Sequence, residues 1–242
     1  MEQKTTIIKE NAKENVKENA IKTHFSRTVD DYDIVADKVV MKNDELHEII
    51  VNAVPFERNQ QLRILDLGSG TAFGMLLILR RFPYATIFGI DFSSKMIESA
   101  RKNLVAYLEH VKLLEDDFTT AVFEKDFNII MSPVTIHNIS HKQKKLLFKK
   151  IYDSLSENGV FINGDFIEAE IAELNIQYQA IYRKFLESNL TGEELQVWLK
   201  HAFVDDKPMK LSEQFELLKD CGFKEISLLW QFNNEAVYIA RK

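Results

Sequence analysis

The stretch Ile64-Leu65-Asp66-Leu67-Gly68-Ser69-Gly70-Thr71-Ala72-Phe73-Gly74 decides the fold of this 242-residue chain. It predicts a short apolar strand that ends in an acid, then a glycine-rich turn and an apolar helix. Two glycines let the turn bend tightly and let a ligand lie against bare main chain. A dinucleotide-binding turn of the form G-x-G-x-x-G would need glycine where this chain has Phe73. The turn alone is also compatible with a tight strand-to-helix connection that holds no ligand.

Composition is typical of a soluble α/β protein with one main domain, at 45% hydrophobic and 28% charged residues. The net charge of −6 argues against a nucleic-acid-binding surface, which needs clustered Lys and Arg. The single cysteine, Cys221, excludes an intrachain disulfide and favours a reducing compartment. No apolar run approaches the length of a membrane span, and the Lys- and Glu-rich N-terminus does not resemble a secretory signal. We therefore expect a cytoplasmic protein.

From Leu62 onward, strand-like apolar runs alternate with helical patterns, which predicts a mostly parallel sheet. Helices are expected at 72–81, 93–108 and 141–155, and strands at 62–66, 85–90, 111–114, 127–131 and 160–164. A helix at 212–220 and two strands at 224–231 and 235–241 close the chain. Because only Asn233-Asn234 connects these two strands, they should form a hairpin and the last strand should be antiparallel.

Two segments fall outside this alternation. Residues 1–23 are polar and predict a flexible tail, so the folded domain is expected to span 24–242. Residues 166–205 break the alternation with two helical patterns that carry Tyr178, Tyr182, Phe185, Trp198 and Phe203, and core packing is the first expectation for Tyr178 and Phe185.

The second predicted strand ends at Asp91, beside the glycine turn. A carboxylate at that place accepts hydrogen bonds from ribose hydroxyls and repels a phosphate-bearing cofactor. The alternative is that Asp91 caps the helix that starts near Ser93. An acidic cluster, Leu114-Glu115-Asp116-Asp117-Phe118, follows the third strand, and Ser132 ends the fourth. Ligands of open α/β sheets bind at these carboxyl ends of successive strands.

The pattern of Asp66, Gly68, Gly70 and Ala72 resembles the first motif of class I S-adenosylmethionine-dependent methyltransferases, and GIDFSSKMIESARKNL resembles their second motif. The resemblance implies a three-layer α/β sandwich with a seven-stranded, mostly parallel sheet whose last strand is antiparallel. It further implies that 166–205 form a helical cap over the substrate, with the aromatic residues of that segment as candidates for its lining. It also implies S-adenosylmethionine as cofactor, with S-adenosylhomocysteine as product. The implied cofactor-binding residues are Asp66, Gly68, Ser69, Gly70, Asp91, Phe92, Met96, Asp116, Asp117, Phe118 and Ser132. In that family the acid before a hydrophobic residue contacts the adenine amino group, which indicates Asp117, with Asp116 as the alternative.

Two residues are candidates for catalysis. His137, in SPVTIHNIS, follows the fourth strand and is the best candidate for a base, while a packing role is equally expected. Tyr32, in HFSRTVDDYD, resembles an aromatic segment that folds over the cofactor, and a core tyrosine is the alternative. His137 and His141 have the spacing of a metal pair, but a helix cap at Ser140 should put them on different elements. The sequence therefore predicts no metal site.

We expect a methyltransferase that acts on a small-molecule acceptor by in-line transfer. The alternatives are an enzyme similar to carboxy-S-adenosylmethionine synthases or another tRNA-modification enzyme, and a non-catalytic S-adenosylmethionine-binding protein. The synthases use a tyrosine near the N-terminal helix, and VVMKNDELHEII has none. The lysines at 142, 144, 145, 149 and 150 are expected on the solvated face of a helix rather than on RNA. No membrane partner is expected, and a homodimer stays open.

Overall fold

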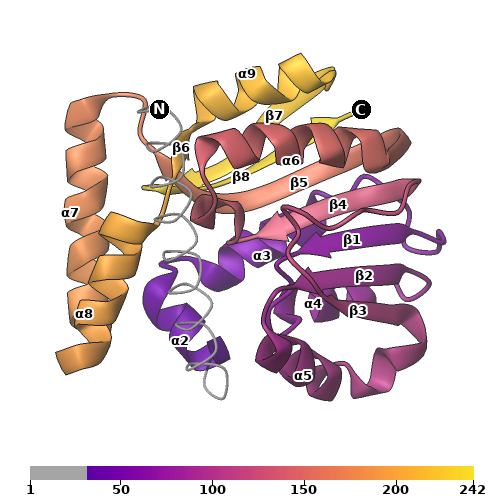
Figure 1. Ribbon diagram of the computed structural model, residues 1–242, viewed down its shortest axis with the longest axis horizontal. Helices are drawn as coiled ribbons and strands as arrows, with labels where there is room; N and C mark the ends of the chain where they lie inside the picture. Colours follow the sequence, from indigo (N-terminus) through magenta and orange to yellow (C-terminus); the bar gives the residue numbers. More distant parts are fainter. Residues whose placement is uncertain (1–31) are drawn as a thin grey trace, which may run out of the picture.

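The computed structural model describes the backbone of residues 32–242 and the side chains from residue 34, so the predicted tail at 1–23 lies outside the described residues. A single sheet with the order β3-β2-β1-β4-β5-β8-β7 forms its centre (Figure 1). The strands on this path are β1 (Arg63–Leu67), β2 (Thr86–Asp91), β3 (Val111–Glu115), β4 (Phe127–Pro133), β5 (Leu155–Glu168), β7 (Glu225–Phe232) and β8 (Glu235–Arg241). The strands β1 to β5 are parallel to one another, and β8 is antiparallel to both β5 and β7, as predicted. A two-residue strand, β6 (Met209–Lys210), also pairs with β5.

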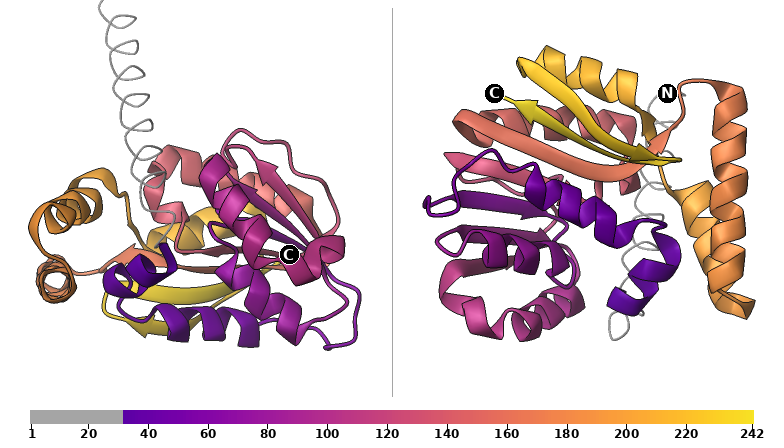
Figure 2. Two further views of the ribbon diagram at one scale, coloured as in Figure 1. Left: turned by 90° about the horizontal axis from the view of Figure 1, so that it is seen from below. Right: turned by 180° about the vertical axis from the view of Figure 1, so that it is seen from behind.

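Helices cover both faces of the sheet, which confirms the three-layer α/β sandwich (Figure 2). On one face α6 (His141–Ser154) and α9 (Leu211–Cys221) bury Phe148 and Leu218 against the sheet. The other face is covered by α3 (Asn43–Asn52), α4 (Phe73–Arg81) and α5 (Ser94–Asn103). Burial of these two apolar layers is the main force that holds the sheet and helices together.

Local signals in the sequence fix several helix ends. The hydroxyl of Ser140 accepts a bond from the amide of Gln143, whose side chain binds back to Ser140, so the predicted capping box of α6 is present. Thr191 occupies the N-cap of α8 (Gly192–Lys200), but its side chain makes no capping bond. Among residues 32–242, no helix combines the length and the apolar character that a bilayer crossing requires.

Three local expectations differ from the structure. The helix predicted at 93–108 ends at Asn103 and is followed by a 3-10 helix, η2 (Val105–His110). Asn158-Gly159 was expected to form a turn before a strand at 160–164, but β5 already begins at Leu155. Asn158, with φ of 64°, lies inside β5, in the part of the strand where its pairing register with β4 shifts. Lys144 is only 1% exposed, because its ammonium donates to the carbonyls of Ile139 and Lys207 rather than to water.

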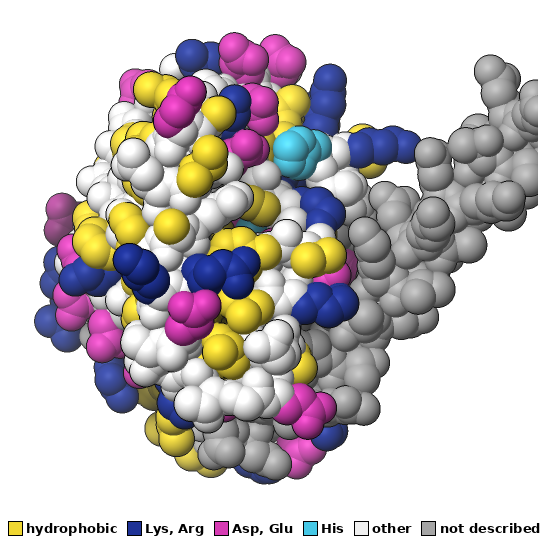
Figure 3. Space-filling model, turned by 90° about the vertical axis from the view of Figure 1, so that its left-hand side faces the viewer, with side chains coloured by type: hydrophobic (Ala, Val, Ile, Leu, Met, Phe, Trp, Pro, Cys, Tyr) yellow, Lys and Arg dark blue, Asp and Glu magenta, His cyan; other side chains and the backbone are white. Residues whose placement is uncertain are grey.

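The segment predicted as a cap at 166–205 begins inside β5, which continues to Glu168, and its helical part starts at Ala172. That part is a hairpin of α7 (Ala172–Asn189) and α8, followed by a π-helical turn, η4 (His201–Asp205). It stands beyond the carboxyl ends of the parallel strands, on the same side as α2 (Tyr32–Val39) (Figure 1). The hydroxyl of Tyr182 donates to the carbonyl of Val39 at 2.8 Å, and both pack in one apolar cluster. Apolar side chains mix with charged ones on the outward face of this hairpin (Figure 3). The cap and α2 thus close over the strand ends where a ligand is expected.

Candidate active site

The glycine turn between β1 and α4 is held by the neighbouring strand. The amides of Gly68 and Ser69 donate to the carbonyl of Ile90 at 2.8 and 3.0 Å. Gly68 has φ of 68°, and a Cβ added there would lie 2.4 Å from Thr135. Only glycine allows both this backbone and the close approach of the loop that follows β4.

Asp91 connects the end of β2 to the same turn. Its carboxylate accepts bonds from the amides of Gly70, at 2.9 Å, and Ser93, at 2.8 Å. Burial raises the pKa of Asp91 to about 6, against the effect of these two amides. The helix cap is provided by Ser93, whose hydroxyl accepts from the amide of Met96. The structure therefore assigns the capping role to Ser93, and Asp91 lies beside the glycine turn.

A cavity of about 160 Å³ opens on the other side of this turn. Its floor is Asp66, the residues 68–71 and the loop after β4, and its walls come from α2, α3 and the cap. The cap contributes Tyr182, Trp198 and His201, and Asp206 follows directly after it. Of the residues predicted from sequence, those that line this one cavity are Asp66, Gly68, Ser69, Gly70, His137, Tyr182 and Trp198.

Several buried polar atoms around the turn have no hydrogen-bond partner among the described residues, which is rare for a protein interior. They are Oδ1 of Asp66 and the hydroxyls of Ser69 and Ser132. Burial, together with the charge of Asp91, raises the pKa of Asp66 well above its ordinary value. A bound cationic group would favour the ionised carboxylate. The unpaired side-chain oxygens and the buried carboxyl of Asp66 fit a polar, positively charged ligand.

Seven predicted cofactor residues, Asp91 among them, do not line this cavity. Ser132, Met96 and Phe118 are buried, and Phe92 is half-buried. Oδ1 of Asp117 accepts from both the amide and the hydroxyl of Thr119, at 2.8 and 2.7 Å. The amide of Asp116 donates to the carbonyl of Asp91, so the acidic loop follows directly beside β2. Tyr32 begins α2, but its side chain lies outside the described residues.

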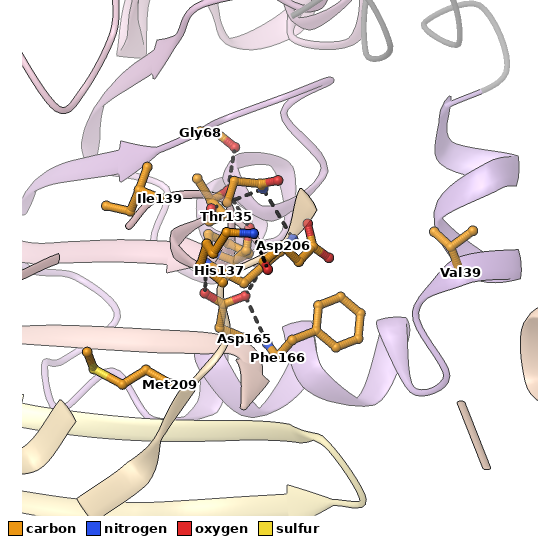
Figure 4. Close-up of polar contacts among 12 residues, drawn as sticks. Val39, Gly68, Thr135, His137, Ile139, Asp165, Phe166, Asp206 and Met209 are labelled. Atoms are coloured by element: carbon orange, nitrogen blue, oxygen red, sulfur yellow. Dashed lines mark hydrogen bonds and ion pairs between the residues drawn. The ribbon is translucent and has the colours of Figure 1, made fainter. Parts of the chain in front are cut away.

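His137 lies in a 3-10 turn, η3 (Ile136–Asn138), and is 4% exposed. Its Nδ1 is 2.5 Å from Oδ1 of Asp165, and its amide donates to Oδ2 of the same carboxylate at 2.8 Å (Figure 4). Nε2 lies 3.1 Å from Nδ2 of Asn138 and 3.9 Å from Oδ2 of Asp206. Burial opposes the imidazolium, but the charges of Asp165 and Asp206 outweigh it and raise the pKa of His137. Asp165 therefore fixes the ring and leaves Nε2 on the cavity side.

Three residues of this group were not predicted from the sequence. Asp165 lies in β5, so the rule that ligands bind at strand ends could have indicated it. His201 and Asp206 are brought together by the π-helical turn, in which the amide of Asp206 donates to the carbonyl of His201 at 3.0 Å. His141, which the sequence analysis compared with His137 as a possible metal pair, lies elsewhere: its Nε2 is 3.2 Å from the carbonyl oxygen of Pro208.

A second cavity, of about 300 Å³, lies behind the first. Phe166, Tyr182 and Asp206 line both cavities and so form the wall between them. Tyr178 and Phe203 line only the second cavity. Phe185 lines neither and packs in the cap cluster, which is the role first expected for it.

Comparison with known proteins agrees with this geometry. A family model described as a methyltransferase domain matches residues 64–159. A carboxy-S-adenosyl-L-methionine synthase from Nautilia profundicola is 30% identical over 189 residues, which are 76% of this chain and 79% of that relative. A malonyl-(acyl-carrier protein) O-methyltransferase from Priestia megaterium is 27% identical, covering 84% of this chain and 75% of its own.

The fold is also found among solved structures. An O-methyltransferase family protein from Burkholderia thailandensis matches 93% of this chain with a TM-score of 0.66 at 12% identity. The chain spans 62% of that protein's length, and at this identity the likeness concerns the fold alone. Sheet order, glycine turn and relatives lead to one conclusion: the chain belongs to the class I S-adenosylmethionine-dependent methyltransferase family.

Proposed function

We propose that this enzyme methylates a small, uncharged or cationic molecule that enters the cavity between the glycine turn and the cap. The observation that carries the proposal is the cavity itself, which joins Asp66 and Gly68 to His137 within about 160 Å³. A concave cavity with walls on several sides suits a small acceptor better than a folded RNA or a protein surface. S-adenosylmethionine, when bound, supplies the methyl group.

The residues around the turn would hold the cofactor. Asp66, buried and with an unpaired Oδ1, is suited to a cationic group of the methionine portion. Asp91 is suited to the ribose hydroxyls, and Asp117, with Asp116 as alternative, to the adenine amino group. The hydroxyls of Ser69 and Ser132 offer further polar contacts. The assignment of Asp117 rests on the family resemblance, and the others rest on strand-end position and on the unpaired oxygens.

His137 is our candidate for the residue that removes a proton from the acceptor. Asp165 holds Nδ1, so Nε2 carries the lone pair on the cavity side. The rings of Phe166 and His201 pack edge-on at 5.1 and 6.5 Å between centroids and keep the imidazole in place. A fixed, buried base beside the cofactor turn is what proton removal during methyl transfer requires.

The charges of the cavity bear on the second candidate, carboxy-S-adenosylmethionine synthesis, which the name of the Nautilia relative favours. Four carboxyl groups, those of Asp37, Asp44, Asp66 and Asp206, line the cavity, and no Lys or Arg of the described residues does. A carboxylated ligand would find no Lys or Arg partner among these residues. This charge balance favours an uncharged or cationic methyl acceptor.

A cytoplasmic location and the oligomeric state stay predictions of the sequence.

Incubation of the purified enzyme with methyl-labelled S-adenosylmethionine and fractionated cell extract tests the proposal. Label should enter small metabolites that are neutral or cationic. Label found only in RNA or protein would refute the small-molecule acceptor. An adduct formed on the cofactor only when a carboxylate donor is added would favour the synthase instead.

A further inference from the structure

The side chains of His137, His201 and Asp206 converge at one place in the structure. Nε2 of His137 lies 3.9 Å from Oδ2 of Asp206, and Nε2 of His201 lies 3.4 Å from Oδ1 of the same carboxylate. One ligand atom from each residue lies within 4.8 Å of the others. Figure 4 shows His137 between the carboxylates of Asp165 and Asp206. Two imidazoles and one carboxylate form the ligand set of many catalytic zinc and iron sites.

The carboxylate of Asp206 is aimed into the cavity without full compensation. Its side chain is 7% exposed and lines the cavity, and its Oδ1 accepts no hydrogen bond within the described part of the chain, where the imidazole of His201 lies 3.4 Å away as an ion-pair contact. A buried carboxylate oxygen without a hydrogen bond is costly, and a bound cation would remove this cost.

The surroundings already have the features of a metal site. Asp165 accepts the hydrogen bond of Nδ1 of His137, as carboxylates do behind metal-bound histidines, and thereby directs Nε2 toward Asp206. The π-helical turn holds His201 and Asp206 together through a backbone bond of 3.0 Å. Ammonium bonds from Lys207 to the carbonyls of Val204, Asp205 and Asp206 close this turn. The two ligand-bearing segments are thus fixed independently of any ion.

We propose that His137, His201 and Asp206 form a binding site for one divalent transition-metal cation of the Zn²⁺, Co²⁺ or Fe²⁺ type. A cation bound at about 2.0–2.2 Å needs ligand atoms about 3.3 Å apart, so small rotations of the rings bring them into place. The nitrogen-rich set excludes Mg²⁺ and Ca²⁺, which prefer oxygen ligands. The lone pair of Nε2 cannot take a proton from the acceptor while it binds a cation. Only this last consequence rests on the proposed function.

Titration calorimetry of the full chain, treated with chelator and then dialysed, tests the site with Zn²⁺ alone. We expect one equivalent to bind to the wild type, and Mg²⁺ to give no saturable binding. His201→Asn and Asp206→Asn should weaken Zn²⁺ binding on the order of 100-fold, and Asp165→Asn by about 10–100-fold. His141→Asn is the matched control, because this exposed histidine has the i,i+4 spacing to His137 but binds Pro208, and it should bind Zn²⁺ like the wild type.

Co²⁺ gives a second readout that does not depend on affinity. Visible absorption bands of a histidine-ligated Co²⁺ should appear with the wild type and be lost in His201→Asn, while circular dichroism confirms that the variant is folded. Absence of stoichiometric Zn²⁺ binding to the wild type, or equal binding by His201→Asn, would overturn the proposal. Neither acceptor nor cofactor is present, so the result is independent of whether methyl transfer occurs.

Discussion

The amide of Gly70 donates a hydrogen bond of 2.9 Å to Oδ2 of Asp91, although the two residues lie 21 positions apart in the chain. The bond forms because β1 and β2 are parallel neighbours whose carboxyl ends meet at one edge of the sheet. It couples the shape of the glycine turn to the acid assigned to the ribose. A ligand that contacts Asp91 therefore also affects the turn that lines the cavity.

Replacement of Asp91 with Asn should weaken S-adenosylmethionine binding. Loss of hydrogen bonds to a charged acceptor costs about 1.5–3 kcal/mol, or about 10- to 150-fold in affinity. Calorimetry measures this directly. Glu98→Gln is the control, because Glu98 is exposed on α5, pairs only with Lys102 and should leave affinity unchanged. Equal affinity of the Asp91 variant and the wild type would show that the ribose assignment is wrong.

Substitution of Gly68 with Ala should destabilise the protein and abolish cofactor binding. Gly192→Ala is a matched control, since Gly192 has a similar φ of 58° but nothing within 4 Å of an added Cβ. We expect the control to cost about 1–2 kcal/mol from the left-handed backbone alone. Gly68→Ala should cost about 1–3 kcal/mol more, because its Cβ meets Thr135. Urea denaturation measures both, and equal losses would contradict the predicted contact.

Glu235 should make stability depend on pH. It is fully buried and accepts the amides of Met41, at 2.7 Å, and Lys42, at 3.1 Å. Burial raises its pKa from 4.5 to about 7, although the two amides oppose the shift. The folded state therefore binds the proton more tightly than the unfolded state, and this group's contribution to stability falls as pH rises from about 4.5 to 7.

The Glu235→Gln variant isolates this effect because its side chain does not titrate. The free energy of unfolding of the wild type, minus that of the variant, should decrease by roughly 3 kcal/mol between pH 4.5 and 7 and be constant above that range. Urea denaturation at a series of pH values measures the difference. A difference that is independent of pH, or that increases with pH, would contradict the assignment.

His137→Gln should lower the rate of methyl transfer by about 10²- to 10⁴-fold, the usual contribution of a general base. Its affinity for S-adenosylmethionine should stay close to that of the wild type, because the cofactor contacts are assigned to other residues. Single-turnover kinetics separate the two quantities. His141→Asn should react like the wild type. An unchanged rate with His137→Gln would favour the alternative role of His137 in packing.

The fold and one half of the site could be predicted from the sequence because both follow local rules. Asp66, the glycine turn and Asp91 stand where apolar strands end, and the strand order places these ends together. The seven main strands were found for the same reason. Strand and helix signals are local, but the start of β5 depends on pairing with β4, which the pattern around Asn158 does not show.

The cap side of the site could not be predicted because long-range packing decides it. His201 and Asp206 meet His137 only through the π-helical turn and the docking of α7 on α2. Spacing pointed instead to His141, which lies on another element and faces Pro208. Lys144 was expected in solvent with its lysine neighbours, but carbonyls from two loops bind its ammonium and bury it.

Titration calorimetry of the full chain tests most directly which ligand the glycine turn binds. Phe73 occupies the position at which a dinucleotide turn needs glycine. We predict saturable one-to-one binding of S-adenosylmethionine and S-adenosylhomocysteine, with no saturable binding of NAD. Saturable NAD binding together with no detectable binding of S-adenosylmethionine would contradict the account.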